Sequence, residues 1–191
     1  MRLRVAALAT LLVLGSGCGG SGVAQTPSTL APSFSWLNPA AAPAGWKATT
    51  TADGAVLAYP PGWHAISGDP GTASAALTAP GGLIIGYLNA TPATPSEVPS
   101  SWARFRVDHN GEEGDRHVHL IAHAGDLRFL TGTGACVTDS YQTSTTAYTE
   151  IACLVQGQGR PTVIVAAATS SAWARQQAAL RTAIAAFRTQ A

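Results

Sequence analysis

Two cysteines placed symmetrically in neighbouring apolar segments restrict the fold of this chain more than any other feature. Segments 135–141 and 148–156 both favour strands, and the polar and small residues between them favour a turn. If Tyr141 lies opposite Tyr148 in a hairpin, the same register places Cys136 opposite Cys153. Directly opposed residues on antiparallel strands have Cα atoms about 4.5–5.5 Å apart, which a disulfide can join. We therefore predict a Cys136–Cys153 disulfide, with two buried free thiols as the alternative.

The first eighteen residues predict the cellular location of the protein. Arg2 and Arg4 precede an apolar run over 5–14, and the small residues 15–17 lead to Cys18. An apolar run of about ten residues is too short to cross a bilayer, so it indicates a signal peptide instead of a membrane helix. The sequence thus predicts secretion.

The small-small-cysteine ending resembles the lipobox of bacterial lipoproteins, although Gly15 stands where leucine is more usual. The resemblance implies that Cys18 becomes the mature N-terminus, carries acyl chains such as palmitate, and anchors a lipoprotein to the outer face of the cell membrane. Two or more acyl chains on one cysteine give stable anchoring. An ordinary secretory leader that is cut elsewhere is the alternative. Outside the cytoplasm the remaining pair, Cys136 and Cys153, is normally oxidised, which favours the disulfide.

Composition predicts three parts in the chain. Residues 19 to about 45 are rich in Gly, Ser, Thr, Ala and Pro and carry almost no charge, which is typical of a flexible linker. Phe34, Trp36 and Leu37 are large apolar exceptions that could dock on a domain. The expected organisation is a lipoprotein signal peptide over 1–17, a lipidated cysteine and flexible linker over 18–45, and one domain over 46–191.

The pattern of the domain predicts an α+β fold, an antiparallel β-sheet flanked by helices. Asp-Gly and Pro-Gly-Gly turns favour hairpins in its first part, and apolar periodicity favours two separate helices. The expected hairpins pair 46–51 with 55–59 and 73–78 with 83–88; further strands are expected over 116–122, 127–131, 135–141, 148–156 and 162–168, and helices over 97–108 and 172–189.

Some of these segments resemble a known family. Trp46 and the stretch Ala-Val-Leu-Ala-Tyr-Pro-Pro-Gly-Trp over 55–63 resemble the opening of PsbP-like domains in secreted bacterial lipoproteins. The closing helix from Trp173 to Phe187 resembles the end of such domains, and the cysteine hairpin is similar to actinobacterial members. The resemblance implies an antiparallel sheet with flanking helices. It implies no activity, because the fold serves assembly and binding roles without shared catalytic residues.

Charge and motifs exclude several classes of function. A net charge of +1 argues against capture of nucleic acid, which needs a clustered basic face. Lys47 is the only lysine, and the chain has no Gly-x-Ser-x-Gly motif, so neither a phosphate-binding loop nor a serine hydrolase is indicated. Asp108, Glu112 and Glu113 lie close together and leave an envelope hydrolase as a third hypothesis. We predict that the protein is not an enzyme and uses no cofactor.

Histidines gather in one segment and suggest a metal site. His117, His119 and His123 would share one face of a strand, and imidazoles at that spacing can bind zinc or copper. The alternative is a solvated polar strand face beside a charged turn.

Together these features predict a membrane-anchored cell-envelope lipoprotein of non-catalytic binding or assembly-accessory type. Its partner would be an envelope protein, a glycan or a lipid. The alternative function is extracytoplasmic metal binding through His117, His119 and His123.

Overall fold

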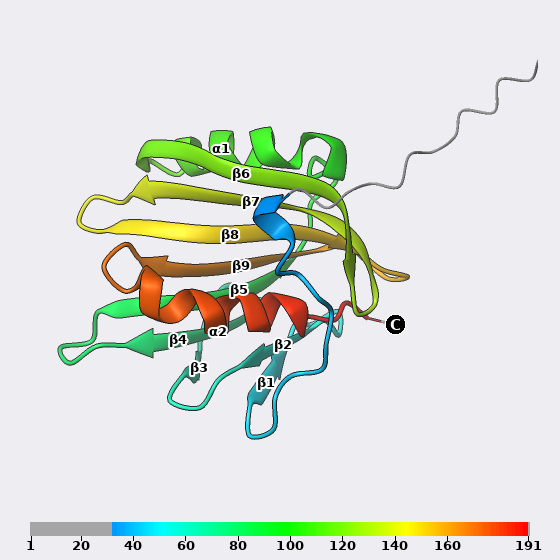
Figure 1. Ribbon diagram of the computed structural model, residues 1–191, viewed down its shortest axis with the longest axis horizontal. Coiled ribbons are helices and arrows are strands. Elements are labelled where there is room, and N and C mark those ends of the chain that lie inside the picture. Colours follow the sequence, from blue (N-terminus) through cyan, green and yellow to red (C-terminus); the bar gives the residue numbers. More distant parts are fainter. Residues whose placement is uncertain (1–31, 191) are drawn as a thin grey trace, which may run out of the picture.

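Seven antiparallel strands form the main sheet of the computed structural model, which describes residues 32–190. Their spatial order is β3-β4-β5-β9-β8-β7-β6, and β1 and β2 form a separate hairpin (Figure 1). The predicted α+β fold, an antiparallel sheet flanked by helices, is therefore confirmed. The strands are β1 (Lys47–Thr50), β2 (Val56–Tyr59), β3 (His64–Ile66), β4 (Ala73–Thr78), β5 (Ile84–Pro92), β6 (Arg116–Phe129), β7 (Gly132–Gln142), β8 (Ala147–Gln156) and β9 (Thr162–Thr169).

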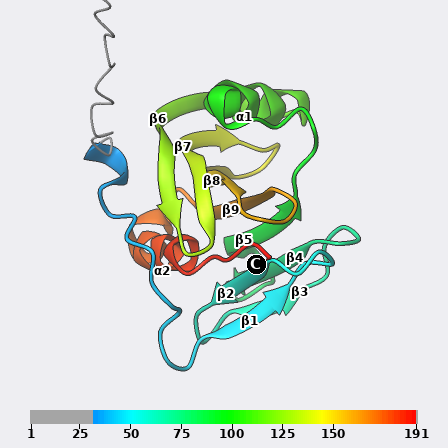
Figure 2. The ribbon, with the colours of Figure 1, turned by 90° about the vertical axis from the view of Figure 1, so that its right-hand side faces the viewer.

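Two helices lie on opposite faces of this sheet. Helix α1 (Trp102–Glu112) covers one face, here called the α1 face, and α2 (Trp173–Ala185) covers the other, the α2 face (Figure 2). The hairpin β1–β2 contributes to the core on the α2 face. All eight residues of β9 are buried, because both of its faces are covered. That double burial explains why β9 is an almost continuous Val, Ile and Ala run without polar alternation.

Each face of the sheet has its own apolar core. The α2 face packs Leu180, Ile184 and Phe187 against side chains of β5, β8 and β9. The α1 face has a smaller core centred on Trp102. The Trp102 indole Nε1 donates a hydrogen bond of 2.9 Å to the carbonyl oxygen of Ala152 in β8, which fixes the start of α1 on the sheet. Among the described residues, no helix is long and apolar enough to cross a membrane.

The folded part begins earlier than the sequence predicts. A short 3₁₀ helix, η1 (Pro32–Phe34), starts a segment whose Phe34 and Leu37 are buried in the α2-face core. The Arg181 guanidinium lies 5.2 Å from the ring centre of Trp36. Within the predicted linker over 18–45, residues 34–37 are therefore docked on the domain. The composition of this segment is dominated by small residues, which is why it resembles a linker. A few large apolar side chains are nevertheless enough to dock it on the core.

Several element boundaries also differ from the predictions. A 3₁₀ turn, η2 (Pro99–Ser101), precedes α1, so the helix covers 102–112 instead of 97–108. One continuous bulged strand, β6, replaces the two strands expected over 116–131. The short strand β3 was not expected at all. The hairpin β1–β2 and the strands β7, β8 and β9 lie within a few residues of their predicted positions.

The docked segment gives a testable prediction. Phe34→Ala should lower the free energy of unfolding by about 3 kcal/mol, because it removes a fully buried ring from the α2-face core. Leu83→Ala is the control, since Leu83 is 52% exposed and its truncation should change stability by less than about 0.5 kcal/mol. Urea denaturation followed by tryptophan fluorescence measures both. If both variants changed the free energy of unfolding by a negligible amount, residues 32–37 would behave as a linker.

Candidate functional site

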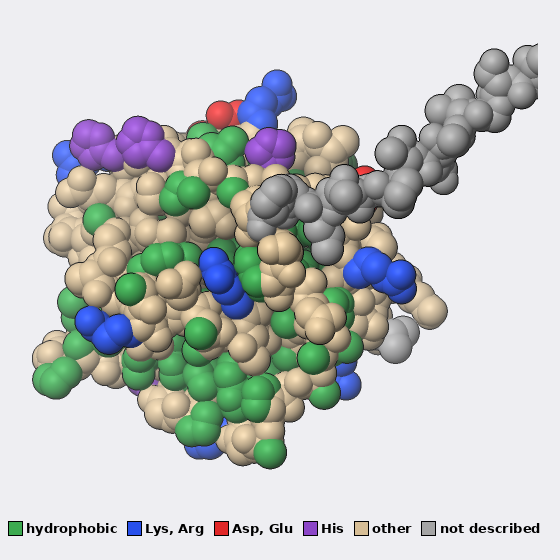
Figure 3. Space-filling model, viewed as in Figure 1, with side chains coloured by type: hydrophobic (Ala, Val, Ile, Leu, Met, Phe, Trp, Pro, Cys, Tyr) green, Lys and Arg blue, Asp and Glu red, His purple; other side chains and the backbone are tan. Residues whose placement is uncertain are grey.

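The three predicted metal-binding histidines lie along β6, an edge strand of the sheet, where histidine side chains follow the upper rim of the molecule (Figure 3). His119 pairs with Ser140 of β7, and His123 pairs with Val137. Paired residues point to the same face, and positions 140 and 137 point to opposite faces because they are an odd number apart. His119 and His123 therefore lie on different faces, and the prediction of one shared histidine face is wrong. The physical reason is the β-bulge between Leu120 and Ala122, which shifts the alternation by one residue.

These histidines therefore do not form the expected ligand set. Within 32–190, no group of three or more His, Cys, Asp and Glu side chains is placed to hold a metal ion. His117 has a positive φ of 53° at another irregular part of β6. His123 lines a hollow of about 360 Å³ between the start of α1 and β6. Metal binding through His117, His119 and His123 stays a prediction from the sequence.

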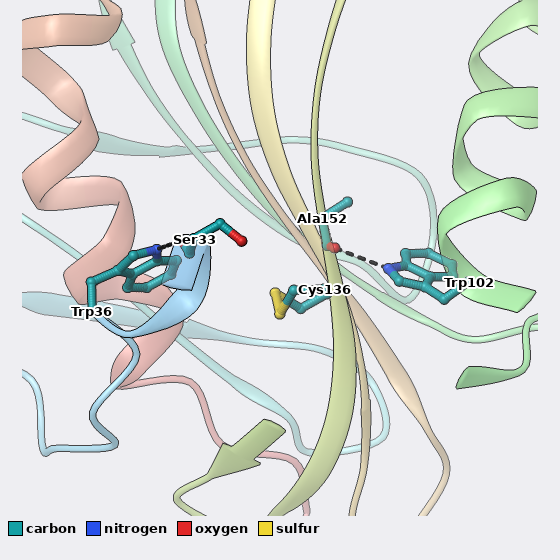
Figure 4. Close-up of a disulfide and its surroundings, with 6 residues drawn as sticks. Ser33, Trp36, Trp102, Cys136 and Ala152 are labelled. Atoms are coloured by element: carbon teal, nitrogen blue, oxygen red, sulfur yellow. Dashed lines mark hydrogen bonds between the residues drawn. A yellow bond between two sulfur atoms is a disulfide. The ribbon is translucent and has the colours of Figure 1, made fainter. Parts of the chain in front are cut away.

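The predicted disulfide is present. Cys136 of β7 and Cys153 of β8 are cross-strand partners with Cα atoms 4.1 Å apart and a bond between their sulfur atoms. The bridge points into the core of the α2 face, on the side of Trp36, whereas Trp102 lies across the strands on the other side (Figure 4). The bridge is fully buried, so its role is structural. Cys18, the predicted lipidation site, lies outside the described residues.

The acidic residues of the hydrolase hypothesis lie on the exposed side of α1. Asp108 is 4.0 Å from Arg104, and Glu113 is 3.3 Å from His109, one helical turn away in each case. Exposed pairs at this spacing stabilise a helix by only a few tenths of a kcal/mol. The arrangement is an ordinary solvated helix surface.

The residues that do converge lie on the α1 face of the β7–β8 ladder. Three consecutive cross-strand pairs follow one another there and change in character along the strands. An apolar pair lies nearest Trp102, an acidic pair lies next, and an aromatic pair lies last. The pairs are Val137 with Ala152, Asp139 with Glu150, and Tyr141 with Tyr148.

The acidic pair is held by an arginine of α1. The Arg106 guanidinium donates two hydrogen bonds to the Glu150 carboxylate, from Nε at 2.6 Å and from Nη2 at 3.0 Å. Glu150 is completely buried, and the Arg106 side chain is 12% exposed. Burial by itself would lower the pKa of Arg106, but the charge and hydrogen bonds of Glu150 outweigh it and raise the pKa. The pair is thus a buried, charge-assisted bidentate contact between α1 and the sheet.

Asp139 lies directly opposite Glu150 and has no such partner. It is fully buried, and neither of its carboxyl oxygens has a hydrogen-bond partner among the residues described. Burial, and then the negative charge of Glu150, raise the pKa of Asp139 to about 8, although Arg106 opposes the shift. Asp139 is therefore neutral in the folded protein at physiological pH, because two buried carboxylates this close cannot both ionise.

The polar cluster continues to the end of α1. Asn110 is completely buried, and neither atom of its side-chain amide has a hydrogen-bond partner in the described part of the chain. Its backbone oxygen accepts a hydrogen bond of 3.0 Å from the backbone N–H of Asp115. Burial, followed by the charges of Glu113 and Glu150, raises the pKa of Asp115. The inner side of α1 is thus half apolar and half polar.

Beyond the acidic pair, the sheet face is open and aromatic. Helix α1 lies mainly over β6 and β7, although Trp102 and Phe105 also belong to the apolar cluster that includes Val163, Val165 and Ala167 of β9. Part of the α1 face near β5 and the end of β9 stays accessible. There, three tyrosines surround a hollow of about 240 Å³, which we call the tyrosine groove. The groove is lined by Ile84, Tyr87, Tyr141, Thr143, Tyr148 and Ala167.

The groove is preorganised by its own contacts. The rings of Tyr141 and Tyr148 are stacked with centroids 5.7 Å apart. The Tyr148 hydroxyl donates to the carbonyl oxygen of Ile84 at 3.4 Å. Burial, and then the charge of Glu150, raises the pKa of Tyr141, and burial raises that of Tyr148, so both hydroxyls stay protonated and can donate hydrogen bonds. Rigid aromatic rings with polar tips are well suited to binding a partner that is partly apolar.

The amino-acid sequence contains a signal for this site, although no binding residue is predicted from it here. The register that pairs Cys136 with Cys153 also pairs Asp139 with Glu150 three residues further along β7. The same register pairs Tyr141 with Tyr148, which places two aromatic rings side by side on one face of the sheet. Arg106 could not have been assigned to Glu150, because only the tertiary structure places α1 over these strands.

The buried ion pair gives a testable prediction. Arg106→Met should lower the free energy of unfolding by about 3–5 kcal/mol, because it leaves the Glu150 carboxylate buried without its cation. Arg104→Met is the matched control on the same helix, since the Arg104 side chain is 86% exposed and its pair should contribute less than about 1 kcal/mol. Urea denaturation measures both. Similar losses for the two variants would contradict a structural role for the Arg106–Glu150 pair.

Asp139 gives a prediction about pH. An unfolded aspartate ionises near pH 4, whereas folded Asp139 keeps its proton up to about pH 8. Between these values the folded state binds the extra proton, so the free energy of unfolding falls as pH rises. Asp139→Asn removes this dependence and should gain stability relative to the wild type as the pH rises from about 4.5 to 8. Exposed Asp108→Asn is the control; parallel stability–pH curves for wild type and Asp139→Asn would refute the assignment.

Comparison with known proteins supports the fold. No family model matches the chain, and no curated protein matches it. Among solved structures, CyanoP, the cyanobacterial PsbP of Synechocystis, aligns with a TM-score of 0.55 and 14% identity over 92% of this chain and 98% of that chain.

Two further solved structures are similar with lower scores. LpqN of Mycobacterium tuberculosis, described as involved in cell envelope biogenesis, has a TM-score of 0.48 and 13% identity over 76% of this chain and 91% of that chain. A protein of unknown function from Pseudomonas aeruginosa has a TM-score of 0.46 and 8% identity over 76% of this chain and 98% of that chain. The similarity to CyanoP shows that this chain has a PsbP-like fold.

Proposed function

We propose that this protein is a non-catalytic accessory module of the cell envelope. A lipid on Cys18 holds it at the outer face of the membrane, and the tyrosine groove binds an envelope partner. The observation that carries the proposal is the aromatic hollow of about 240 Å³ on the part of the α1 face that the helix does not cover. The PsbP-like fold is compatible with such a role.

The construction of the groove favours binding over a purely structural role. Tyr87, Tyr141 and Tyr148 are all partly exposed, although the sheet around them is buried. Two of the three belong to adjacent paired strands, and β7 and β8 are also joined by the disulfide. A partner therefore meets rings that are already ordered, which lowers the entropic cost of binding.

A lipid anchor would increase the fraction of grooves that are occupied by a partner. Attachment to the membrane confines the module and its partners to the same thin layer of the envelope, which raises their effective concentration. A small groove with modest affinity is then sufficient. The partner is an envelope protein, a glycan or a lipid headgroup.

Photo-crosslinking in intact cells tests the proposal. A benzophenone amino acid at position 87 should give a reproducible adduct, because that position lines the groove. The same amino acid at position 65 is the control, since Ala65 is exposed on β3 and does not line the groove. Tyr148→Ala should abolish the position-87 adduct, because it removes one side of the stacked pair.

The outcomes separate a groove partner from incidental contact. An adduct of the same mass from both positions, or an adduct at position 87 that persists in Tyr148→Ala, would overturn the groove as the binding site. Loss of the adduct with unchanged thermal stability of Tyr148→Ala would support it.

A further inference from the structure

We propose that the α2 side of the molecule rests on the surface of an anionic phospholipid bilayer. The contact is made by Lys47, Arg175, Arg181 and Arg188, which we call the cationic face. Lys47 lies on β1, Arg175 and Arg181 on α2, and Arg188 just after α2. The inference rests on the proposed function in one respect, the anchor at Cys18.

The ion pairs of the described residues gather around α1. They join Arg104 with Asp108, Arg106 with Glu150, and His109 with Glu113. In the space-filling view of the α2 side, Lys and Arg side chains are spread over the surface, whereas Asp and Glu are visible only near its upper rim (Figure 3).

The four cations of this face lack carboxylate partners. No carboxylate among residues 32–190 lies within ion-pair distance of Lys47, Arg175, Arg181 or Arg188. Unpaired cations on one side of a domain create a positive potential there, which is attracted to anionic lipid headgroups. The face is therefore complementary in charge to an anionic membrane.

The spacing of the cations favours a surface over a small anion. Arg175 and Arg188 lie near the two ends of α2, a helix about 20 Å long. One phosphate group cannot contact both, whereas a layer of headgroups can. Between Lys47 and Arg188 lies a hollow of about 330 Å³ whose walls include Trp46 and Leu130. Tryptophan beside basic residues is typical of surfaces that contact the membrane interface.

The path of the chain brings this side toward the anchor. Helix η1 lies on the α2 side of the sheet in both ribbon views (Figures 1 and 2). Residues 18–31 join Cys18 to Pro32, and a chain of that length spans at most about 50 Å. An anchor at Cys18 would thus hold the domain near the bilayer, with the tether leaving from the side that carries the cations.

Vesicle binding by the unlipidated chain tests the face separately from the anchor. The protein is residues 18–191 with Cys18→Ser, which contains the whole described fold. It should bind vesicles of phosphatidylcholine with 30% phosphatidylglycerol and not vesicles of phosphatidylcholine alone. Without Arg2 and Arg4 the chain has nine basic side chains against ten acidic ones, so net charge cannot drive this binding.

Single-charge variants locate the contact. Lys47→Gln, Arg175→Gln and Arg188→Gln should each weaken binding to the anionic vesicles about fivefold, and the triple variant should lose it. Arg104→Gln is the charge-matched control, because Arg104 lies on α1, and it should bind as the parent does. Raising the salt concentration from 0.05 M to 0.5 M should also release the protein, since screening shortens the reach of the charges.

Three results would overturn the inference: no binding to the anionic vesicles, equal binding to both vesicle types, or a loss in Arg104→Gln as large as in the face variants. Mass spectrometry of Cys18 in the native protein examines the anchor independently. A lipidated Cys18 without vesicle binding rejects only the cationic face, whereas vesicle binding with an unmodified Cys18 rejects only the anchor.

Discussion

The register of β7 against β8 determines which side chains meet on both faces of the sheet. On the α2 face it brings Cys136 and Cys153 together in the core, where the disulfide locks the two strands. On the α1 face the same register brings Asp139 opposite Glu150 and Tyr141 opposite Tyr148. A shift of β8 by one residue would turn its side chains to the other face of the sheet and separate every pair. The buried cluster and the groove therefore depend on one alignment of two strands.

Two side chains of α1, Trp102 and Arg106, attach the helix to the sheet through hydrogen bonds. The helix does not depend on a continuous apolar stripe. Trp102 anchors its start through the hydrogen bond to Ala152, and Arg106 binds Glu150 one turn later. A buried ion pair contributes little net stability compared with an apolar pair of equal size, but its geometry is far more specific. The contact places α1 mainly over β6 and β7, and part of the sheet face near β5 stays accessible as the tyrosine groove.

The two proposed surfaces lie on opposite sides of the sheet and are compatible with each other. If the cationic face rests on the bilayer, the α1 face with the tyrosine groove points away from the membrane, toward envelope partners. The charge distribution agrees with this orientation, because Asp108 and Glu112 lie on α1 and Glu113 directly follows it, on the far side from the bilayer. The fold would then act as a spacer that sets both the distance and the direction of the binding groove.

The sequence by itself determined the strand hairpins, the cysteine pairing and the α+β class, because these depend on local alternation and turn chemistry. Only the tertiary structure decided the docking of Phe34, the separation of His119 from His123 by a β-bulge, and the meeting of Arg106 with Glu150. Those features depend on contacts between residues far apart in the chain or on an irregular register, and neither leaves a periodic signal. The candidate site belongs to both groups, because its carboxylate and tyrosine pairs follow from the β7–β8 register, whereas Arg106 reaches Glu150 only because α1 packs on the sheet.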